Sequence, residues 1–262
     1  MFSAQQDRRE AEIRRYYETL YQAWGAQHWW PAETQFEVIV GAYLTQNTSW
    51  TNVERALANL RLAGLLSVEG IRRVRRAKLE RLIRPSGYFR QKAQRLKTFV
   101  AFLDNKYEGS LETLFSQPTE KLREQLLSLN GVGPETADSI LLYAGNHPVF
   151  VVDGYTRRIL DRHNILPEKT GYEEIRHLFE QSLERLSREQ EQKTPGDRKQ
   201  LESGIRGASH PPSAISTAHR TALVQVYNEM HGLIVGVGKN HCGKSQAKCD
   251  GCPLQPFLLA GK

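Results

Sequence analysis

Three cysteines near the C-terminus are the first residues whose types and spacing could do chemistry. The chain has 262 residues, and its cysteines all lie in CGKSQAKCDGC, at Cys242, Cys249 and Cys252. Three thiols cannot form a paired disulfide framework, and their clustering indicates a metal site instead. The three cysteines are separated by six residues and then by two.

A glycine turn is the second such feature. The sequence Asn130-Gly131-Val132-Gly133 separates two helical patterns, the first of which Thr119 is expected to cap and the second of which begins at Pro134. The backbone N–H groups at such a helix start suit a phosphate oxygen, and no side chain obstructs the approach. A plain connection between two helices would use the same turn, so both interpretations stay open.

Charge and composition limit the class of protein. The chain carries a net charge of +7 and 39% hydrophobic residues, which fits one large or two modest globular domains. Residues 71–84, IRRVRRAKLERLIR, contain seven Lys or Arg and one Glu, so a net +6 lies in that segment. A polyanionic partner or a solvated basic helix face would explain it. No apolar run approaches the ~20 residues of a membrane span, and we expect a cytoplasmic protein.

The elements that must position these residues are mainly helical, because apolar residues recur at helical spacing through most of the chain. One extended apolar run, PVFVVD at residues 148–153, is strand-like but short. Residues 187–213 are rich in Gln, Glu, Lys, Arg, Ser, Gly and Pro. We interpret them as a mobile insertion between a helix ending near Leu186 and another beginning around Thr217, or else as a loop that orders on binding.

The segment LNGVGPETADSILLYAGNHPVFVVDGYTRRIL, residues 129–160, resembles the helix-hairpin-helix (HhH-GPD) DNA glycosylases of the endonuclease III superfamily. The resemblance implies an all-α fold of two helical domains with the active site in the cleft between them. It divides the chain into a central domain of residues 34–147, containing the hairpin, and a second domain of residues 1–33 plus 148–262. Gly131 and Gly133 would then contact DNA phosphate.

The same resemblance makes Asp153 the essential catalytic Asp at the mouth of the base pocket. Breaking an N-glycosidic bond builds positive charge on the sugar, which a fixed carboxylate stabilises while it orients or deprotonates water. The alternative role for Asp153 is a helix N-cap. Bifunctional relatives carry a Schiff-base Lys where this chain has Glu135, so the resemblance implies a monofunctional enzyme, with a Lys from elsewhere as the alternative.

The segment HWWPAETQFEVIVGAYLTQNTSWTNVERALANL, residues 28–60, is similar to the 3-methyladenine DNA glycosylase III branch. It implies a base pocket made by Trp29, Trp30 and Phe36, where an indole face attracts a cationic alkylated purine by ~1–2 kcal/mol. Ordinary packing aromatics are the alternative. By resemblance, Gln46 and Tyr88 would contact DNA and take part in extruding the base. The basic run would place positive charge beside the duplex backbone.

In iron–sulfur members four cysteines follow the spacing six, two and five, and Cys242, Cys249 and Cys252 match the first three while Leu258 stands at the fourth. Because a [4Fe–4S] cluster normally takes four thiolates, three outcomes stay open. They are a cluster with a non-cysteine ligand, a zinc site completed by His241 or His231, and no metal.

We therefore expect a monofunctional glycosylase of base excision repair that removes alkylated purines such as 3-methyladenine. Its partner would be double-stranded DNA with a damaged base, and it would act as a monomer, nucleoid-associated if bacterial. A glycosylase for a mismatched, deaminated or oxidised base, with AP-lyase activity as a variant, is the enzyme alternative. A non-catalytic helix-hairpin-helix DNA-binding protein is the alternative from another class.

Overall fold

A computed structural model describes residues 2–191 and 210–258, and in these residues the chain is helical with no β-strand beyond one isolated bridge between Cys242 and Ala247. Contacts between Cα atoms divide the chain into two units: unit 1, residues 1–31 with 148–262, and unit 2, residues 32–147. In the described part of the chain, no helix combines the length and apolar character that a membrane span requires.

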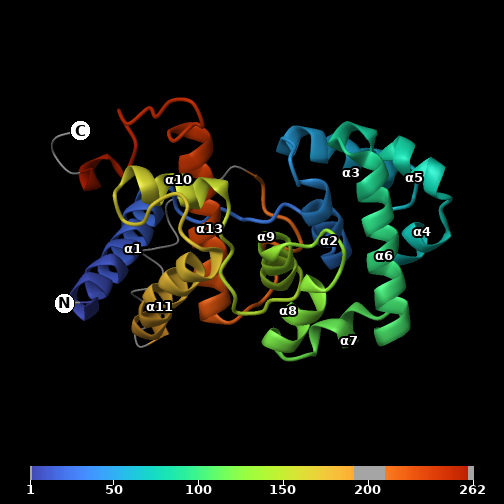
Figure 1. Ribbon diagram of the computed structural model, residues 1–262, viewed down its shortest axis with the longest axis horizontal. Coiled ribbons are helices and arrows are strands. Elements are labelled where there is room, and N and C mark those ends of the chain that lie inside the picture. Colours follow the sequence, from blue (N-terminus) through green and yellow to red (C-terminus); the bar gives the residue numbers. More distant parts are fainter. Residues whose placement is uncertain (1, 192–209, 259–262) are drawn as a thin grey trace. The chain divides into compact units, whose positions relative to one another are not determined.

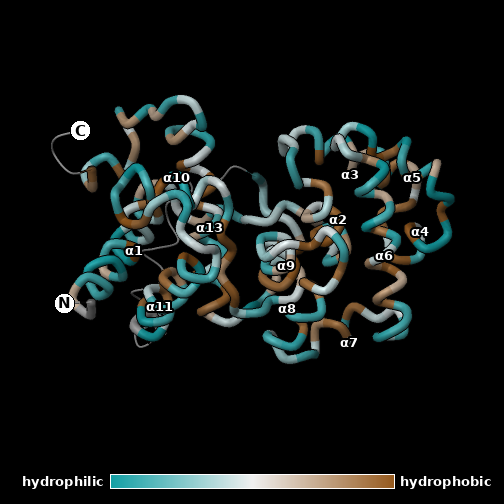
Figure 2. Tube along the Cα trace, in the orientation of Figure 1, coloured by the Kyte–Doolittle hydropathy of each residue, from teal (hydrophilic) through white to brown (hydrophobic). Residues whose placement is uncertain are grey.

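Unit 1 is built on α13, Ala222–Asn240, against which α1 (Phe2–Trp24), α10 (Gly154–Arg162) and α11 (Tyr172–Glu191) pack (Figure 1). A short 3₁₀ turn, η3, covers Gln255–Phe257. The helix α13 is hydrophobic through most of its length, whereas α1 is largely hydrophilic (Figure 2). The core of unit 1 is filled by fully buried apolar side chains of these helices: Ile13, Leu20, Ile175, Phe179, Leu183, Met230, Leu233 and Ile234.

Unit 2 contains α2 (Gln35–Leu44), α3 (Trp50–Leu62), α4 (Val68–Arg73), α5 (Arg76–Leu82), α6 (Phe89–Tyr107), α7 (Leu111–Phe115), α8 (Thr119–Leu127) and α9 (Pro134–Ser139). A 3₁₀ turn, η1, spans Arg84–Ser86, and α9 continues as a π-helical turn, η2, over Ile140–Ala144. The apolar helix α2 packs against η2, α3 and α6. Buried Ile39, Leu60, Leu103 and Ile140 belong to this core, on which the hairpin and the connecting turns of unit 2 are built.

Three local expectations differ from the structure. Thr119 is the first residue of α8 rather than its cap, and its hydroxyl lies 3.0 Å from Nδ1 of His147. The run 148–153 forms no strand with the described residues. The helix expected to end near Leu186 extends to Glu191, so residues 187–191 are helical. The helix expected to begin around Thr217 begins at Ala222. Most of the expected insertion, residues 192–209, lies outside the described residues.

Candidate active site and nucleic-acid interface

Asp153 is the N-cap of α10 and keeps one carboxylate oxygen for another task. Its Oδ1 accepts hydrogen bonds from the backbone N–H of Thr156 at 2.8 Å and from the Thr156 hydroxyl at 2.9 Å. Its Oδ2 accepts no hydrogen bond from the described residues and lies 3.7 Å from Nε2 of His231. Capping and catalysis are therefore compatible, because the two oxygens of a single carboxylate divide the roles.

Side chains of α11 hold the extended run that ends at Asp153. The N–H of Phe150 donates to Oε1 of Glu180 at 3.0 Å, and the N–H of Val152 donates to the hydroxyl of Tyr172 at 3.3 Å. The ring of Phe150 stacks on Phe179 with centroids 4.3 Å apart. A buried backbone needs such partners, and here side chains provide what a neighbouring strand would otherwise supply.

One of the three outcomes open for the cysteine segment was a zinc site completed by His241 or His231. The structure places His231 beside Asp153. It lies on the buried face of α13, with its ring edge-on to Phe150 at a centroid distance of 6.3 Å. Burial lowers the pKa of His231, against an opposing effect of the Asp153 charge, so the imidazole is neutral. A His in the middle of an apolar helix was the sequence signal, but its partner is distant in sequence.

Trp29 and Trp30 are both buried in unit 1, with ring centroids 5.3 Å apart. Trp29 packs closely on α13, since a Cβ at Gly232 would lie 3.1 Å from Cβ of Trp29. The ammonium of Lys239 lies 5.3 Å from the centroid of the Trp29 ring. Lys239 therefore already occupies one position over the Trp29 ring where a cation could bind. Phe36 is buried in α2 of unit 2.

The glycine turn is tied to the loop after α2 through Gln46. Gly131 has φ 80°, which glycine adopts without strain, whereas Gly133 is the extended N-cap of α9. The amide of Gln46 donates to the Gly131 carbonyl at 3.0 Å and to the Thr136 hydroxyl at 2.9 Å. Arg95 donates to Oε1 of Gln46 at 2.6 Å. In this structure Gln46, expected to contact DNA, braces the hairpin.

Tyr88 lies in the second turn that sequence reasoning assigned to DNA. Its side chain is 64% exposed, and its backbone is left-handed at φ 44° directly before α6. Buried Lys92 donates to the carbonyl of Ser86 at 2.6 Å and to that of Leu44 at 2.8 Å. One ammonium therefore joins the turn that carries Tyr88 to the end of α2, just before Gln46. Sequence reasoning missed Lys92, because its role depends on those two carbonyls.

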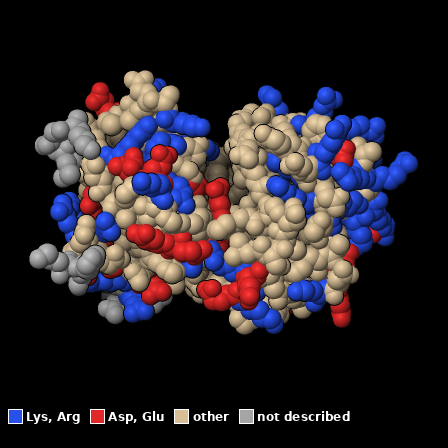
Figure 3. All heavy atoms as spheres, in the orientation of Figure 1, with Lys and Arg blue, Asp and Glu red and all other residues tan. Residues whose placement is uncertain are grey.

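The basic run separates into paired and unpaired cations. Arg72 pairs with Glu69 and Asp104, Arg73 with Glu69, and Arg76 with Glu80. The second group forms no ion pair with the described residues and consists of Arg75, Lys78, Arg81 and Arg84. Figure 3 shows Lys and Arg gathered over the α4 and α5 part of unit 2. We call Arg75, Lys78 and Arg81, exposed at three-residue spacing, the α5 row; it is the part of the run most available to an anion.

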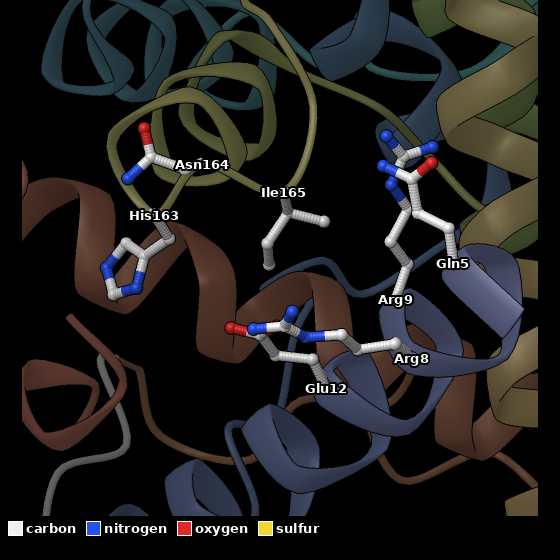
Figure 4. Close-up of a pocket in the computed structure, with 7 residues that line it drawn as sticks. All are labelled: Gln5, Arg8, Arg9, Glu12, His163, Asn164 and Ile165. Carbon is white, nitrogen blue, oxygen red and sulfur yellow. The ribbon is translucent and has the colours of Figure 1, made fainter. Parts of the chain in front are cut away.

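A pocket elsewhere in unit 1 is lined by residues of α1 and by those that end or follow α10 (Figure 4). Its lining residues are Gln5, Arg8, Arg9, Glu12, His163, Asn164 and Ile165. Burial lowers the pKa of His163 to about 4, so this ring is neutral too. The pocket contains neither Asp153 nor the tryptophans.

The cysteine segment does not fit a cluster held by four cysteines. The guanidinium of Arg162 lies 3.1 Å from Sγ of Cys242, and the fourth position of the family spacing is aliphatic Leu258. His241 lies 3.3 Å, through Nδ1, from the carbonyl of Lys248, while His231 faces Asp153. Among residues 2–191 and 210–258, no three Cys, His, Asp or Glu side chains are arranged to hold a metal ion.

Comparison with known proteins identifies the family of this chain. The family described as HhH-GPD superfamily base excision DNA repair protein matches residues 40–185. A protein of Methanocaldococcus jannaschii, named as a candidate DNA repair glycosylase, is 41% identical over 95% of this chain and 96% of its own length. Endonuclease III-like protein 1 of Mus musculus is 26% identical over 87% of this chain and 62% of its own.

Solved structures give the same fold. The Helicobacter pylori 3-methyladenine DNA glycosylase bound to 1,N6-ethenoadenine superposes with a TM-score of 0.67 at 28% identity, covering 88% of this chain and 97% of that one. A non-covalent endonuclease III–DNA complex gives a TM-score of 0.66 at 19% identity, covering 95% and 94%. The chain therefore belongs to the HhH-GPD superfamily of base excision DNA repair proteins and is a DNA glycosylase.

Proposed function

We propose that this protein is a monofunctional DNA glycosylase that removes alkylated purines such as 3-methyladenine from double-stranded DNA, acting as a monomer. The observation that carries the proposal is that the two oxygens of Asp153 have different surroundings. Oδ1 is fixed by hydrogen bonds from Thr156, whereas Oδ2 remains available to act on the sugar and water. The similarity to the Helicobacter pylori enzyme supports the choice of a damaged purine.

The proposed reaction breaks the bond between C1′ and the purine nitrogen, and the electron pair leaves with the base. Oδ2 of Asp153 stabilises the positive charge that develops on the sugar, then takes one proton from the water that attacks C1′. The products are the free base and an abasic sugar in an uncut strand. Because the glycosidic bond of an N3-alkylated purine is already weakened by its charge, no acid is needed to protonate the leaving base.

The lack of lyase activity in this proposal rests on Glu135. This residue is exposed in the first turn of α9. By resemblance, it stands at the position where bifunctional members of the family carry the lysine that forms a Schiff base. A carboxylate cannot form a Schiff base with C1′. Strand scission by the protein without added alkali would contradict this part of the proposal.

DNA would be contacted by the hairpin turn, the Tyr88 turn and the α5 row, all in unit 2. The hairpin offers backbone N–H groups to a phosphate, and exposed Tyr88 is suited to fill the space of an extruded base. The cations of the α5 row add a contribution that depends on salt. Arg84 and Arg90 also lie beside the Phe89 ring, at 6.0 and 5.8 Å from its centroid, next to Tyr88.

Lys239 favours a second candidate substrate. Its ammonium already occupies a position over the Trp29 ring, where a cationic base would meet like charge. A neutral modified purine, of the kind bound to the Helicobacter pylori relative, would avoid that repulsion.

The experiment that tests the proposed function is base release from duplexes that each carry one lesion. The panel contains 3-methyladenine, 1,N6-ethenoadenine, a deaminated base and a mismatch, with undamaged duplex as the control. We expect release of 3-methyladenine by the native protein and loss of that release in Asp153→Asn. Release of ethenoadenine alone favours the neutral-base candidate. No release from any duplex, or full activity of Asp153→Asn, overturns the mechanism.

A further inference from the structure

The relationship between Asp153 and His231 goes beyond the function of Asp153 alone. Oδ2 of Asp153 and Nε2 of His231 are 3.7 Å apart, and their side chains retain 13% and 6% of their exposure. Both atoms belong to unit 1, so their separation is set within one compact unit. This distance is too long for a direct N–H···O hydrogen bond. Two groups at this distance can share one water molecule, each at ~2.8 Å from its oxygen.

Several packing contacts fix the two atoms. The cap bonds from Thr156 to Oδ1 hold the Asp153 carboxylate, leaving Oδ2 to face α13. The His231 ring is held edge-on to Phe150, whose own N–H is bound by Glu180. Neither side chain can turn away without breaking one of these contacts. The pair is thus prepared in advance for a bound molecule, which is the arrangement that catalytic groups require.

The charge state of His231 suits the same task. Burial lowers its pKa, so the ring is neutral and one of its nitrogens carries a lone pair. A protonated ring would form an ion pair with Asp153 and remove the negative charge that the sugar cation needs. A neutral ring leaves that charge in place.

We propose that His231 is a second residue of the hydrolytic machinery, which holds the attacking water jointly with Asp153. The inference rests on the proposed function of Asp153. The water donates one hydrogen to Oδ2 and the other to Nε2, which directs its oxygen lone pairs away from both groups and toward C1′. In the reaction, the water oxygen forms the bond to C1′, its proton passes to Oδ2, and the base leaves with the electron pair. His231 accepts a hydrogen bond throughout and changes no charge.

The test compares His231→Phe with His231→Gln. Phenylalanine keeps a ring against Phe150 but has no acceptor, whereas glutamine has an amide oxygen that can accept from water. We measure the single-turnover rate of base release at saturating enzyme, the Kd for a duplex with an uncleavable abasic analogue, and the thermal unfolding midpoint. His231→Phe is expected to lower the rate by about 10²-fold while changing Kd by less than about threefold. His231→Gln is expected to recover at least about a tenth of the native rate.

A matched control is Tyr227→Phe on the same face of α13. Tyr227 also contacts Phe150, with centroids 6.0 Å apart, but its hydroxyl donates to the carbonyl of Glu180 rather than facing Asp153. This variant perturbs the same packing without touching the proposed water, so we expect a near-native rate. If it slows base release as much as His231→Phe does, the role of His231 is structural and the inference is overturned.

The double variant Asp153→Asn, His231→Phe separates this inference from the proposed function. If His231 works on the water that Asp153 activates, the double variant is no slower than Asp153→Asn alone. Loss of activity in Asp153→Asn with native activity in His231→Phe overturns the role of His231 and leaves the function intact. Native activity in Asp153→Asn overturns the function itself. If His231→Phe fails to fold, equal rates for His231→Gln and His231→Leu contradict the inference.

Discussion

Thr156 donates two hydrogen bonds to a single oxygen of Asp153, from its backbone N–H at 2.8 Å and from its hydroxyl at 2.9 Å. This geometry lets the charge of Asp153 be removed without removing the cap. An asparagine at 153 still accepts both bonds through its amide oxygen.

We therefore expect Asp153→Asn to remain folded and to lose 10²- to 10⁴-fold in the single-turnover rate, roughly the range for removing a general base. Thr156→Val removes only the hydroxyl bond and should lower the free energy of unfolding by about 1 kcal/mol. Thermal unfolding and base-release kinetics measure the two effects. A large drop in the unfolding midpoint of Asp153→Asn would show that Asp153 serves mainly as the cap.

The two glycines of the hairpin form a matched pair. A Cβ at Gly131 would collide with the guanidinium of Arg95, and its φ of 80° is costly for alanine. We expect Gly131→Ala to lower the free energy of unfolding by about 1–2 kcal/mol and to disturb the bond between Arg95 and Gln46. A Cβ at Gly133 meets nothing within 4 Å.

Gly133→Ala should therefore fold like the native protein, so that its Kd for duplex DNA reports on contact with phosphate. An increase in Kd of at least about tenfold, or about 1.4 kcal/mol, is expected if the backbone approaches DNA closely. Equal Kd values for Gly133→Ala and the native protein would remove the hairpin turn from the DNA interface.

Tyr88 can be removed at no cost in stability, because its side chain is 64% exposed and its backbone is left-handed. Tyr88→Gly should keep or raise the unfolding midpoint and lower base release from duplex by about tenfold, while sparing release from single strands. Leu62→Ala is the matched control, since Leu62 is an apolar side chain 88% exposed at the end of α3. Equal losses in the two variants would contradict a specific role for Tyr88.

The α5 row should control the salt dependence of DNA binding. Replacing Arg75, Lys78 and Arg81 together by Gln should make the association constant for DNA less sensitive to salt. The magnitude of the slope of its logarithm against the logarithm of salt concentration should fall by about 2–3, since each phosphate contact contributes about 0.9. Arg72→Gln is the control, because Arg72 is already paired with Glu69 and Asp104. An unchanged slope in the triple variant would place the DNA on another surface.

Lys92 predicts a dependence of stability on pH. Burial, assisted by the charge of Arg95, lowers its pKa from 10.5 to about 8. Between these two pKa values the unfolded chain holds a proton at Lys92 that the folded chain has released, so stability rises with pH. Between pH 7.5 and 10.5, the free energy of unfolding of the native protein should rise by up to about 3 kcal/mol relative to that of Lys92→Met. Denaturant unfolding of both proteins measures this, and a constant difference would refute the shift.

The sequence predicted those parts of the site whose function depends on neighbours along the chain. The hairpin glycines need a local backbone shape, Asp153 caps the helix that begins at the next residue, and Tyr88 follows Gly87 in a turn that exposes its ring. Each of these local structures is decided within about four residues, so a pattern along the chain can predict it. The roles of Asp153 and Tyr88 were predicted from the resemblance to the family.

Long-range packing decided the rest. The contact between Gln46 and DNA stays a prediction, and folding adds the hydrogen bond from its amide to the Gly131 carbonyl, 85 residues further along the chain. The charge of the basic run is partly neutralised by Asp104, which only folding brings to Arg72.

By itself the sequence determined a helical chain with a hairpin, a carboxylate at a helix start and an incomplete set of cysteines. Tertiary structure alone placed His231 beside Asp153 and Lys92 between two turns. The physical reason is that a buried polar group must find its partner wherever the packed helices provide one, and no spacing along the chain records which helix that is.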